Sequence, residues 1–436
     1  MINQGPVSTA RSRTGSIELE NAVRADKPEF PIHAQPSTLN PQLSTLRIAL
    51  LTGGGDKPYA LGMAAALTAA GIQVDFIGSD DLKVPDLLSN PRVKFLNLRG
   101  DQRPEANRMA KVERVLSYYV GLIRYAFTAK PRLFHILWNN KFEFFDRTLL
   151  MSYYKLLGKK IIFSAHNVNA GKRDATDSWL NRLSLRVQYT LSDHIFVHTE
   201  AMKSELASDF RVPEDKISVI PFGINNTVPN TGVSALGAKA RLGIGASEKT
   251  MLFFGNIAPY KGLEYLVAAF IRLMRTRDDC CLIIAGRIKG SESYWGEIEQ
   301  TLKSNWVRDR VIARIEYIPD EETELYFKAA DILILPYTRI FQSGVLFLGY
   351  SFGLPAIAAD VGNLKEEVIE GQTGFVFKAR DSSDLAGKID KYFNSELFHN
   401  LETRRAAIKA YANDKHSWSK VAAMTAARYS DLLASR

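Results

Sequence analysis

The chain has 436 residues, of which 46% are hydrophobic and 24% charged, a composition typical of a soluble globular protein with two or three domains. No apolar run approaches the roughly 18 uncharged residues that a membrane-spanning helix needs, so we expect any membrane contact to be peripheral. The two cysteines, Cys280 and Cys281, are neighbours, and adjacent strand residues point to opposite faces. They predict no disulfide framework and favour a reduced, cytoplasmic setting.

The net charge of +9 is concentrated in one region of the chain. Residues 99–173 contain fifteen Lys and Arg against five Asp and Glu, interleaved with aromatic residues such as Tyr118, Phe142 and Tyr153. A basic, aromatic surface can contact anionic lipid, nucleic acid or only solvent. The sequence shows no base-reading module, so we expect no nucleic-acid partner and favour an anionic membrane surface, with a merely solvated face as the alternative.

In chain order, residues 1–46 are rich in Ser, Thr, Pro, Gln and Asn without periodicity, and we predict a disordered tail with no apolar core for a signal peptide. An apolar run from Arg47 predicts the first strand. It leads into Gly53, Gly54 and Gly55 and then into an amphipathic helix from Pro58. A glycine loop between strand and helix allows close approach of a phosphate, so the Gly54 and Gly55 amides are candidate donor-binding groups.

Further apolar runs predict strands at residues 73–77, 93–98, 133–138, 160–164, 194–197 and 217–220, with helical patterns between most of them. This alternation predicts a parallel, doubly wound α/β sheet. A Pro, Gly, Ser and Asn-rich stretch then follows, so we predict a first domain over 47–225 and a second over 226–415.

The second domain repeats the alternation. Strands are predicted at residues 251–254, 280–285, 312–318, 332–335 and 355–359, with helices at 261–276, 344–353, 384–393 and 396–411. After the strand at 332–335, a polar loop leads through Gln342, Ser343, Gly344 and Val345 into a helix. Because the first N–H groups of a helix lack intrahelical partners and carry the positive end of its dipole, this loop predicts a phosphate site.

Two further motifs mark the second domain. Phe254-Gly255-Asn256 is followed by Lys261-Gly262, and a glycine turn at Gly362 precedes Glu367 and a Gly-Gln-Thr-Gly sequence. In combination with the Ser-Gly loop, these motifs resemble the family-4 type glycosyltransferases, over nearly all of residues 47–436. That resemblance implies the GT-B fold, in which two Rossmann-like doubly wound domains face each other across a cleft. It also implies that residues 416–436 form a helix crossing back to the first domain.

The resemblance implies roles for individual residues. Lys261 is the candidate catalytic cation that stabilises the departing diphosphate. His166, at the end of a predicted strand, matches the family's catalytic histidine that faces the donor sugar. Asn256 stands where the family usually has arginine and can bind a phosphate oxygen without charge. Stabilisation of the departing diphosphate would therefore depend more on Lys261 and on the backbone amides.

A second departure concerns the family's paired glutamates. Aligned from Gly353, their places hold Ile340 and Leu348, which cannot bind a sugar hydroxyl or a ribose diol. Gln342 and Glu367 are the polar residues that we expect to take over donor contacts, with a solvent-exposed loop role as the alternative for each. No His, Cys, Asp and Glu cluster has metal-ligand spacing, and the resemblance implies a metal-independent reaction without a cofactor.

We therefore expect a cytoplasmic hexosyltransferase, peripheral on the inner face of the cell membrane. It would use a nucleoside diphosphate sugar and a glycan or lipid-linked acceptor in surface polysaccharide or glycolipid biosynthesis. Two alternatives remain open. One is a GT-B enzyme with other chemistry, such as a sugar-nucleotide epimerase, which would turn over its donor without an acceptor. The other is a non-catalytic nucleotide or carbohydrate-binding protein, which the missing glutamates make conceivable.

Overall fold

The computed structural model describes residues 43–102, 108–173, 176–226, 228–290 and 292–434. These residues belong to one compact unit of the chain, residues 33–436. The predicted disordered tail lies outside the described residues except for its last four positions.

The first sheet has seven parallel strands in the order β3-β2-β1-β4-β5-β6-β7. The strands are β1 (Arg47–Leu51), β2 (Gln73–Gly78), β3 (Val93–Asn97), β4 (Leu133–Ile136), β5 (Lys160–Ser164), β6 (His194–Val197) and β7 (Ile217–Val219). Leu51 pairs with Ile77 on one side and with Ile136 on the other. Strand order therefore reverses beside β1, and the glycine loop that follows β1 opens at this switch point, where ligands of such sheets bind.

The second sheet has six strands in the order β10-β9-β8-β11-β12-β13, and every pairing is parallel. They are β8 (Lys249–Phe254), β9 (Cys280–Ala285), β10 (Val311–Arg314), β11 (Ile332–Leu335), β12 (Ala356–Ala359) and β13 (Gly374–Phe377). Here the switch point lies between β8 and β11. The loops at residues 255–261 and 336–343 leave the carboxyl ends of these two strands and so meet at one edge of the sheet.

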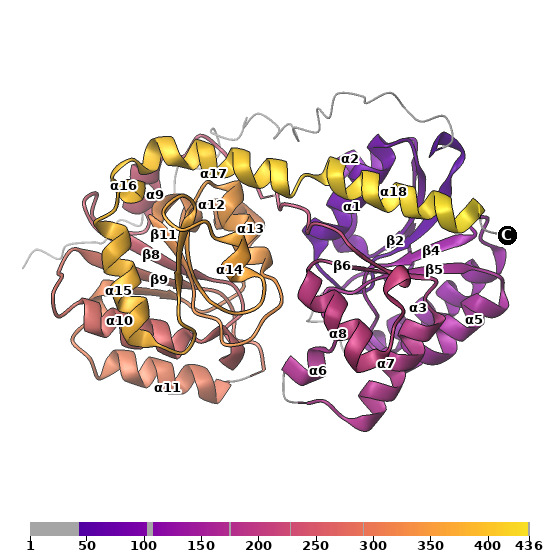
Figure 1. The fold of residues 1–436 in the computed structure, drawn as a ribbon, viewed down its shortest axis with the longest axis horizontal. Coiled ribbons are helices and arrows are strands. Elements are labelled where there is room, and N and C mark those ends of the chain that lie inside the picture. Colours follow the sequence, from indigo (N-terminus) through magenta and orange to yellow (C-terminus); the bar gives the residue numbers. More distant parts are fainter. Residues whose placement is uncertain (1–42, 103–107, 174–175, 227, 291, 435–436) are drawn as a thin grey trace, which may run out of the picture. The chain divides into compact units, whose positions relative to one another are not determined.

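Helices flank both sheets (Figure 1). Those of the first domain are α1 (Lys57–Ala69), α2 (Pro85–Ser89), α3 (Arg108–Thr128), α4 (Glu143–Phe145), α5 (Met151–Leu156), α6 (Ala170–Arg173), α7 (Trp179–Leu191) and α8 (Glu200–Phe210). Those of the second are α9 (Ala235–Arg241), α10 (Leu263–Leu273), α11 (Glu292–Lys303), α12 (Asp320–Ala329), α13 (Gly344–Ser351), α14 (Leu364–Glu367), α15 (Ser382–Phe393), α16 (Glu396–His399) and α17 (Leu401–Lys415). The last helix is α18 (Trp418–Ala434).

Burial explains the doubly wound architecture. In β1, Ile48 and Leu50 belong to the apolar core on one face of the sheet, and Ala49 and Leu51 to the core on the other. Such a strand is apolar throughout because helices cover both faces. The fold class predicted from the sequence, two Rossmann-like α/β domains, is confirmed.

The terminal helix α18 packs on the first domain although it follows the second. Val421, Ala426 and Tyr429 lie in the same buried core as β1 and α1. A Cβ atom added to Gly62 of α1 would lie 2.2 Å from the Trp418 indole, so only glycine permits this approach.

Three predicted elements differ from the observed ones. The predicted helix over 396–411 is two helices, because Asn400 leaves helical geometry and its side chain bonds back to Glu396. The predicted strand over 312–318 stops at Arg314 and pairs only with β9, at the edge of the sheet. The predicted helix from Lys261 begins at Leu263, because Gly262 adopts a left-handed conformation with φ +64°.

Candidate active site

A cavity of about 310 Å³ brings the two domains' switch-point loops together. Its lining from the first domain includes Asp56, Pro58, Tyr59 and residues 222–225. From the second domain it includes Tyr260, Lys261, Ile340, residues 342–345 and Leu348, and Trp418 of α18 completes it. The space matches the lower end of the range for small-molecule sites, which is about 300–1,000 Å³.

Lys261 is held in the cavity wall by an aromatic residue from the next switch-point loop. Its Nζ donates to Tyr337 Oη at 2.7 Å and lies 3.9 Å from the centroid of the same ring. The turn at Gly262 makes this possible, because a Cβ there would lie 2.0 Å from the Pro336 carbonyl oxygen. The buried ammonium is thereby fixed next to the start of α13.

The helix α13 presents its N-terminus to the cavity through Ser343, Gly344 and Val345. Ser343 Oγ donates to Tyr337 Oη at 3.3 Å, so one tyrosine connects Lys261 to the helix start. A Cβ at Gly344 would meet no atom within 4 Å, which leaves the backbone open for a ligand. The Lys261 ammonium and the N-terminus of α13 therefore both place positive charge at the same cavity, an arrangement that suits a diphosphate.

Three other lining residues complete this wall. Gln342 lines the cavity, and its buried Oε1 has no hydrogen-bond partner within the described part of the chain. Buried polar atoms are normally paired, so this acceptor points to a ligand donor group. Ile340 and Leu348, which stand at the positions of the family's glutamates, also line the cavity and make it apolar there.

His166 lies directly behind the cavity. Its ring stacks on Trp138 at 4.1 Å and contacts the cavity residue Tyr59 edge-on at 4.6 Å. Its Nδ1 lies 3.0 Å from Nε2 of His198, whose own Nδ1 lies 3.2 Å from the Ile220 carbonyl oxygen.

This chain of contacts assigns the tautomers. Burial lowers the pKa of His198 to about 4, so its ring is neutral near pH 7. A carbonyl can only accept, so His198 Nδ1 carries the proton and Nε2 accepts from His166 Nδ1–H. Burial, together with repulsion from His198 and His135, holds the pKa of His166 well below its usual value. Its buried Nε2, which has no hydrogen-bond partner among the described residues, is therefore unprotonated near pH 7 and can accept a hydrogen bond but not act as an acid.

Besides His166, four predicted site residues do not line this cavity. The first-domain glycines pack on their neighbours: a Cβ at Gly54 would lie 2.9 Å from the Arg99 guanidinium, and one at Gly55 would lie 1.8 Å from the Trp138 ring. Asn256 instead accepts from Arg287 Nε at 3.4 Å.

Glu367, the fourth, is buried on the side of the chain's last two helices. His416 donates to its carboxylate at 3.0 Å, and Lys415 Nζ lies 2.8 Å from the same oxygen. Burial alone would raise its pKa, but these two partners lower it overall. The carboxylate is thus paired with the C-terminal end of α17 and is not available to a donor.

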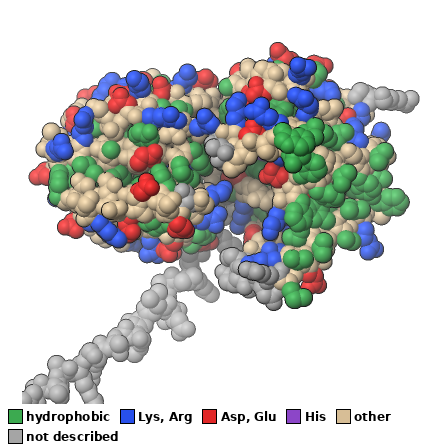
Figure 2. Space-filling model, turned by 90° about the horizontal axis from the view of Figure 1, so that it is seen from below, with side chains coloured by type: hydrophobic (Ala, Val, Ile, Leu, Met, Phe, Trp, Pro, Cys, Tyr) green, Lys and Arg blue, Asp and Glu red, His purple; other side chains and the backbone are tan. Residues whose placement is uncertain are grey.

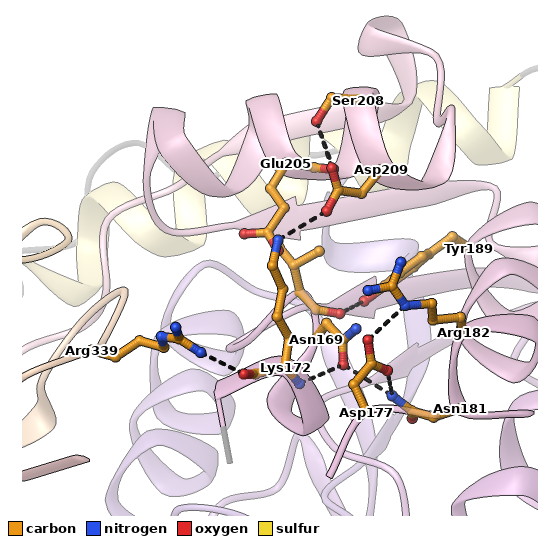
Figure 3. A network of polar contacts seen from close by, with 11 residues as sticks. Asn169, Lys172, Asp177, Asn181, Arg182, Tyr189, Glu205, Ser208, Asp209 and Arg339 are labelled. Atoms are coloured by element: carbon orange, nitrogen blue, oxygen red, sulfur yellow. Dashed lines mark hydrogen bonds and ion pairs between the residues drawn. The ribbon is translucent and has the colours of Figure 1, made fainter. Parts of the chain in front are cut away.

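A polar network supports the cavity loop from the first domain (Figure 3). Arg339, next to the lining residue Ile340, donates to the backbone carbonyl of Lys172 in α6 at 2.7 Å. The Lys172 ammonium in turn contacts Asp209 at 3.1 Å and Glu205 at 3.4 Å, both in α8. The loop that carries Ile340 is therefore tied to α6 and, through Lys172, to α8 of the first domain.

The sequence analysis did not predict the lining residues Asp56, Tyr59, Phe222, Asn225 and Trp418. It also did not predict Tyr337, which lies beneath Lys261 without lining the cavity. Position after a first-domain strand was a usable signal for Phe222 and Asn225. For Tyr337 and Trp418 there was no signal, since their partners lie 76 and 194 residues away. Among the described residues, no group of three His, Cys, Asp or Glu is placed to hold a metal ion, and no helix is long and apolar enough to cross a membrane.

Residues 53–227 match the family described as Glycosyltransferase Family 4, and residues 248–395 match Glycosyl transferases group 1. A D-inositol 3-phosphate glycosyltransferase of Pseudarthrobacter chlorophenolicus is 27% identical over 239 residues, which are 54% of this chain and 55% of that one. A protein of the same name from Corynebacterium aurimucosum is 22% identical over 408 residues, 87% of this chain and 91% of the other. The chain spans 55–59% of the length of the first relatives it matches.

Solved structures resemble the whole fold. Sucrose-phosphate synthase from Thermosynechococcus elongatus superposes with a TM-score of 0.70 at 20% identity, over 90% of this chain and 100% of that one. Anabaena HepE, solved with UDP-glucose, gives 0.67 at 16% identity, over 88% of this chain and 100% of the other.

Two facing Rossmann-like domains with their switch-point loops on one cavity define a protein of the GT-B glycosyltransferase fold. The matches to both domains go further. The chain belongs to the family-4 type glycosyltransferases.

Proposed function

We propose that this protein transfers a hexose from a nucleoside diphosphate sugar to a hydroxyl of a glycan or lipid-linked acceptor. The observation that carries the proposal is the convergence of the Lys261 ammonium and the α13 N-terminus on one cavity. A nucleoside diphosphate is the leaving group whose charge develops as the glycosidic bond breaks. Positive groups that are already fixed where the diphosphate departs lower the activation free energy of bond cleavage, because they need not reorganise during the reaction.

Other polar groups in the cavity wall or just behind it fit the donor sugar and the acceptor. Gln342 Oε1 and His166 Nε2 are buried acceptors that can bind sugar hydroxyls. Asp56 and Asn225 lie on the first-domain side, where we place the acceptor. Lys261 and α13 provide the positive charge that a divalent cation would otherwise supply, so we propose a metal-independent reaction.

The biological setting is also part of the proposal. The relatives named D-inositol 3-phosphate glycosyltransferase and the HepE structure with UDP-glucose support sugar transfer from an activated donor. We propose a role in surface polysaccharide or glycolipid biosynthesis, carried out in the cytoplasm by a protein peripherally bound at the inner face of the cell membrane.

Thermal unfolding with UDP, GDP, ADP and TDP tests the donor site. A nucleotide present at about 100 times its dissociation constant should add roughly 2.7 kcal/mol of stability. Lys261→Ala should lose most of that gain, since a charge-assisted hydrogen bond contributes about 1.5–3 kcal/mol. Lys303→Met, which removes an exposed lysine paired with Glu299 on α11, is the matched control and should retain it.

Turnover then separates the alternatives. A transferase consumes its sugar nucleotide faster when an acceptor is present, with EDTA having no effect. An epimerase would convert the donor without any acceptor, and a binding protein would leave it intact. Stabilisation by no nucleotide, or equal stabilisation of wild type and Lys261→Ala, would contradict the proposed donor site.

A further inference from the structure

The helix α3 carries an exposed apolar stripe on its outer side. Met109, Val112, Leu116, Val120, Ile123 and Phe127 follow one another at intervals of three or four residues, so they share one face of the helix. Their exposed fractions range from 37% for Ile123 to 83% for Met109. A different face of the same helix, with Tyr118, Leu122 and Ala126, is buried against the sheet. The helix therefore has a second apolar face that the chain itself does not cover.

The stripe continues onto the segments beside α3. Tyr119 of α3 stacks on Phe142 at 5.7 Å and accepts its backbone N–H at 3.2 Å, and Tyr153 of α5 donates to the Ile123 carbonyl at 3.3 Å. Phe142 and Phe144 are each 51% exposed and Leu149 is 63% exposed. We call the six stripe residues with Phe142, Phe144 and Leu149 the α3 apolar face. Figure 2 shows hydrophobic side chains gathered on one side of the first domain.

We propose that the α3 apolar face inserts into the interfacial region of a bilayer that contains anionic lipids. Soluble monomers rarely expose contiguous apolar patches larger than a few hundred Å², and those that do often use them to bind a partner or a membrane. An apolar helix face bordered by cationic residues is the arrangement of helices that lie in a membrane interface. The proposal deepens the membrane association suggested above by assigning it to particular residues.

Charge favours a membrane over a second copy of the chain. The region from residue 99 to residue 173 has fifteen basic and five acidic residues. On α3 itself, Arg124 lies beside the stripe, as does the acidic Glu113, whereas Lys111 and Arg114 fall toward the buried side. Lys130 and Lys141, both exposed, follow the helix and precede Phe142. Two copies meeting through this face would bring like charges together, whereas anionic headgroups would neutralise them, at about 1 kcal/mol per basic residue near the surface.

One end of the α3 apolar face, at Phe142, lies close in the chain to residues behind the cavity. Trp138, which stacks on His166, follows β4, and Phe142 comes four residues later. Trp138 also contacts the cavity residue Tyr59 edge-on at 5.6 Å. Given the proposed function, a protein seated by this face would present the acceptor side of its cavity to a lipid-linked substrate near the bilayer surface.

Vesicle co-sedimentation tests the proposal with the full chain and without any nucleotide. The wild type should bind phosphatidylcholine vesicles containing about 30% phosphatidylglycerol, and part of the binding should persist in 0.5 M salt, because apolar insertion is not screened. The triple variant Val112→Ser/Leu116→Ser/Val120→Ser should bind at least about tenfold more weakly. The matched control, Leu236→Ser/Trp306→Ser, changes two exposed apolar residues of the second domain and should bind as the wild type does.

The three replaced side chains are 55–59% exposed, so the triple variant should melt like the wild type and keep its nucleotide response. Equal binding of the triple variant and the wild type would overturn the proposal, as would complete release of the wild type by salt. A dimer in solution that the triple variant dissociates, with no vesicle binding, would assign the face to a second copy instead. Lys261→Ala should bind vesicles normally, so failure of the donor site and failure of the membrane face are distinguishable.

Discussion

Replacing Gly262 with alanine tests how the fold positions Lys261. Gly262 has φ +64° and lies against the backbone of the β11 loop, where a Cβ would be 2.0 Å from the Pro336 oxygen. Alanine should therefore incur two costs. The left-handed conformation costs about 1–2 kcal/mol, and moving a packed backbone costs roughly 1–3 kcal/mol more.

Gly243→Ala is the matched control for the first cost. Gly243 has φ +72°, and a Cβ there would meet no atom within 4 Å. It should destabilise the protein by the conformational term alone, about 1–2 kcal/mol. The difference between the two variants, measured by chemical denaturation, therefore isolates the close approach to Pro336.

The same substitution should reach the active site. Displacing the Pro336 backbone moves Tyr337 away from Lys261, whose 2.7 Å contact holds the ammonium in the cavity. We expect nucleotide affinity, measured by calorimetry, to fall at least about tenfold in Gly262→Ala, which corresponds to about 1.4 kcal/mol, and to stay unchanged in Gly243→Ala. Equal destabilisation of both variants, or unchanged affinity in Gly262→Ala, would refute this reasoning.

Two other predictions concern stability. Burial lowers the pKa of His135 to about 3 and that of His198 to about 4, whereas both titrate near 6.5 when unfolded. Between these values only the unfolded chain binds the protons, so the contribution of each ring to stability is complete above pH 6.5. It is lost as the pH falls toward 4 for His198 and toward 3 for His135. At pH 5 each ring should lower the free energy of unfolding by about 2 kcal/mol relative to neutral pH. Between pH 4 and 6.5, chemical denaturation of His198→Gln should show a pH slope that corresponds to about one proton fewer taken up on unfolding than in the wild type. Trp418→Ala should cost about 3–5 kcal/mol, because its indole fills the space above Gly62 and Gly223; an unfolding free energy within 1 kcal/mol of wild type would argue against that packing role.

Strand positions were predictable because each buried parallel strand is apolar on both faces. The run at residues 332–335 and the pair Cys280-Cys281 within β9 are examples. Where the signal was local, as in the Ser-Gly entry to α13, the predicted element and its start agree with the structure. β13 was not predicted as a strand, because its run begins at Gly374, and glycine weakens a strand pattern.

The site residues show where sequence reasoning stops. The placement of Lys261 in the cavity depends on Tyr337, which only the pairing of β8 with β11 brings close. Glu367 was expected at the donor because its motif suggested it, but His416 and Lys415 lie beside it once α17 has folded back. Such contacts between distant segments leave no local pattern in the chain.

The α3 apolar face illustrates a different limit. The sequence indicated a basic, aromatic region, and charge was its visible signal. Tyr118 and Tyr119 proved to be buried, while aliphatic residues such as Leu116 and Val120 are the exposed ones. A helix that is apolar on two faces shows no clear amphipathic pattern, so only the structure reveals which face is covered.

A crystal structure with the nucleoside diphosphate that stabilises the protein would show directly whether Lys261 and the start of α13 hold the diphosphate. We expect the terminal phosphate to lie within about 3.2 Å of Lys261 Nζ and of the Gly344 and Val345 backbone nitrogens, with a hydrogen-bond donor of the ligand at Gln342 Oε1. A nucleotide whose phosphates bind elsewhere, at the Gly54 loop or outside the cavity, would contradict it.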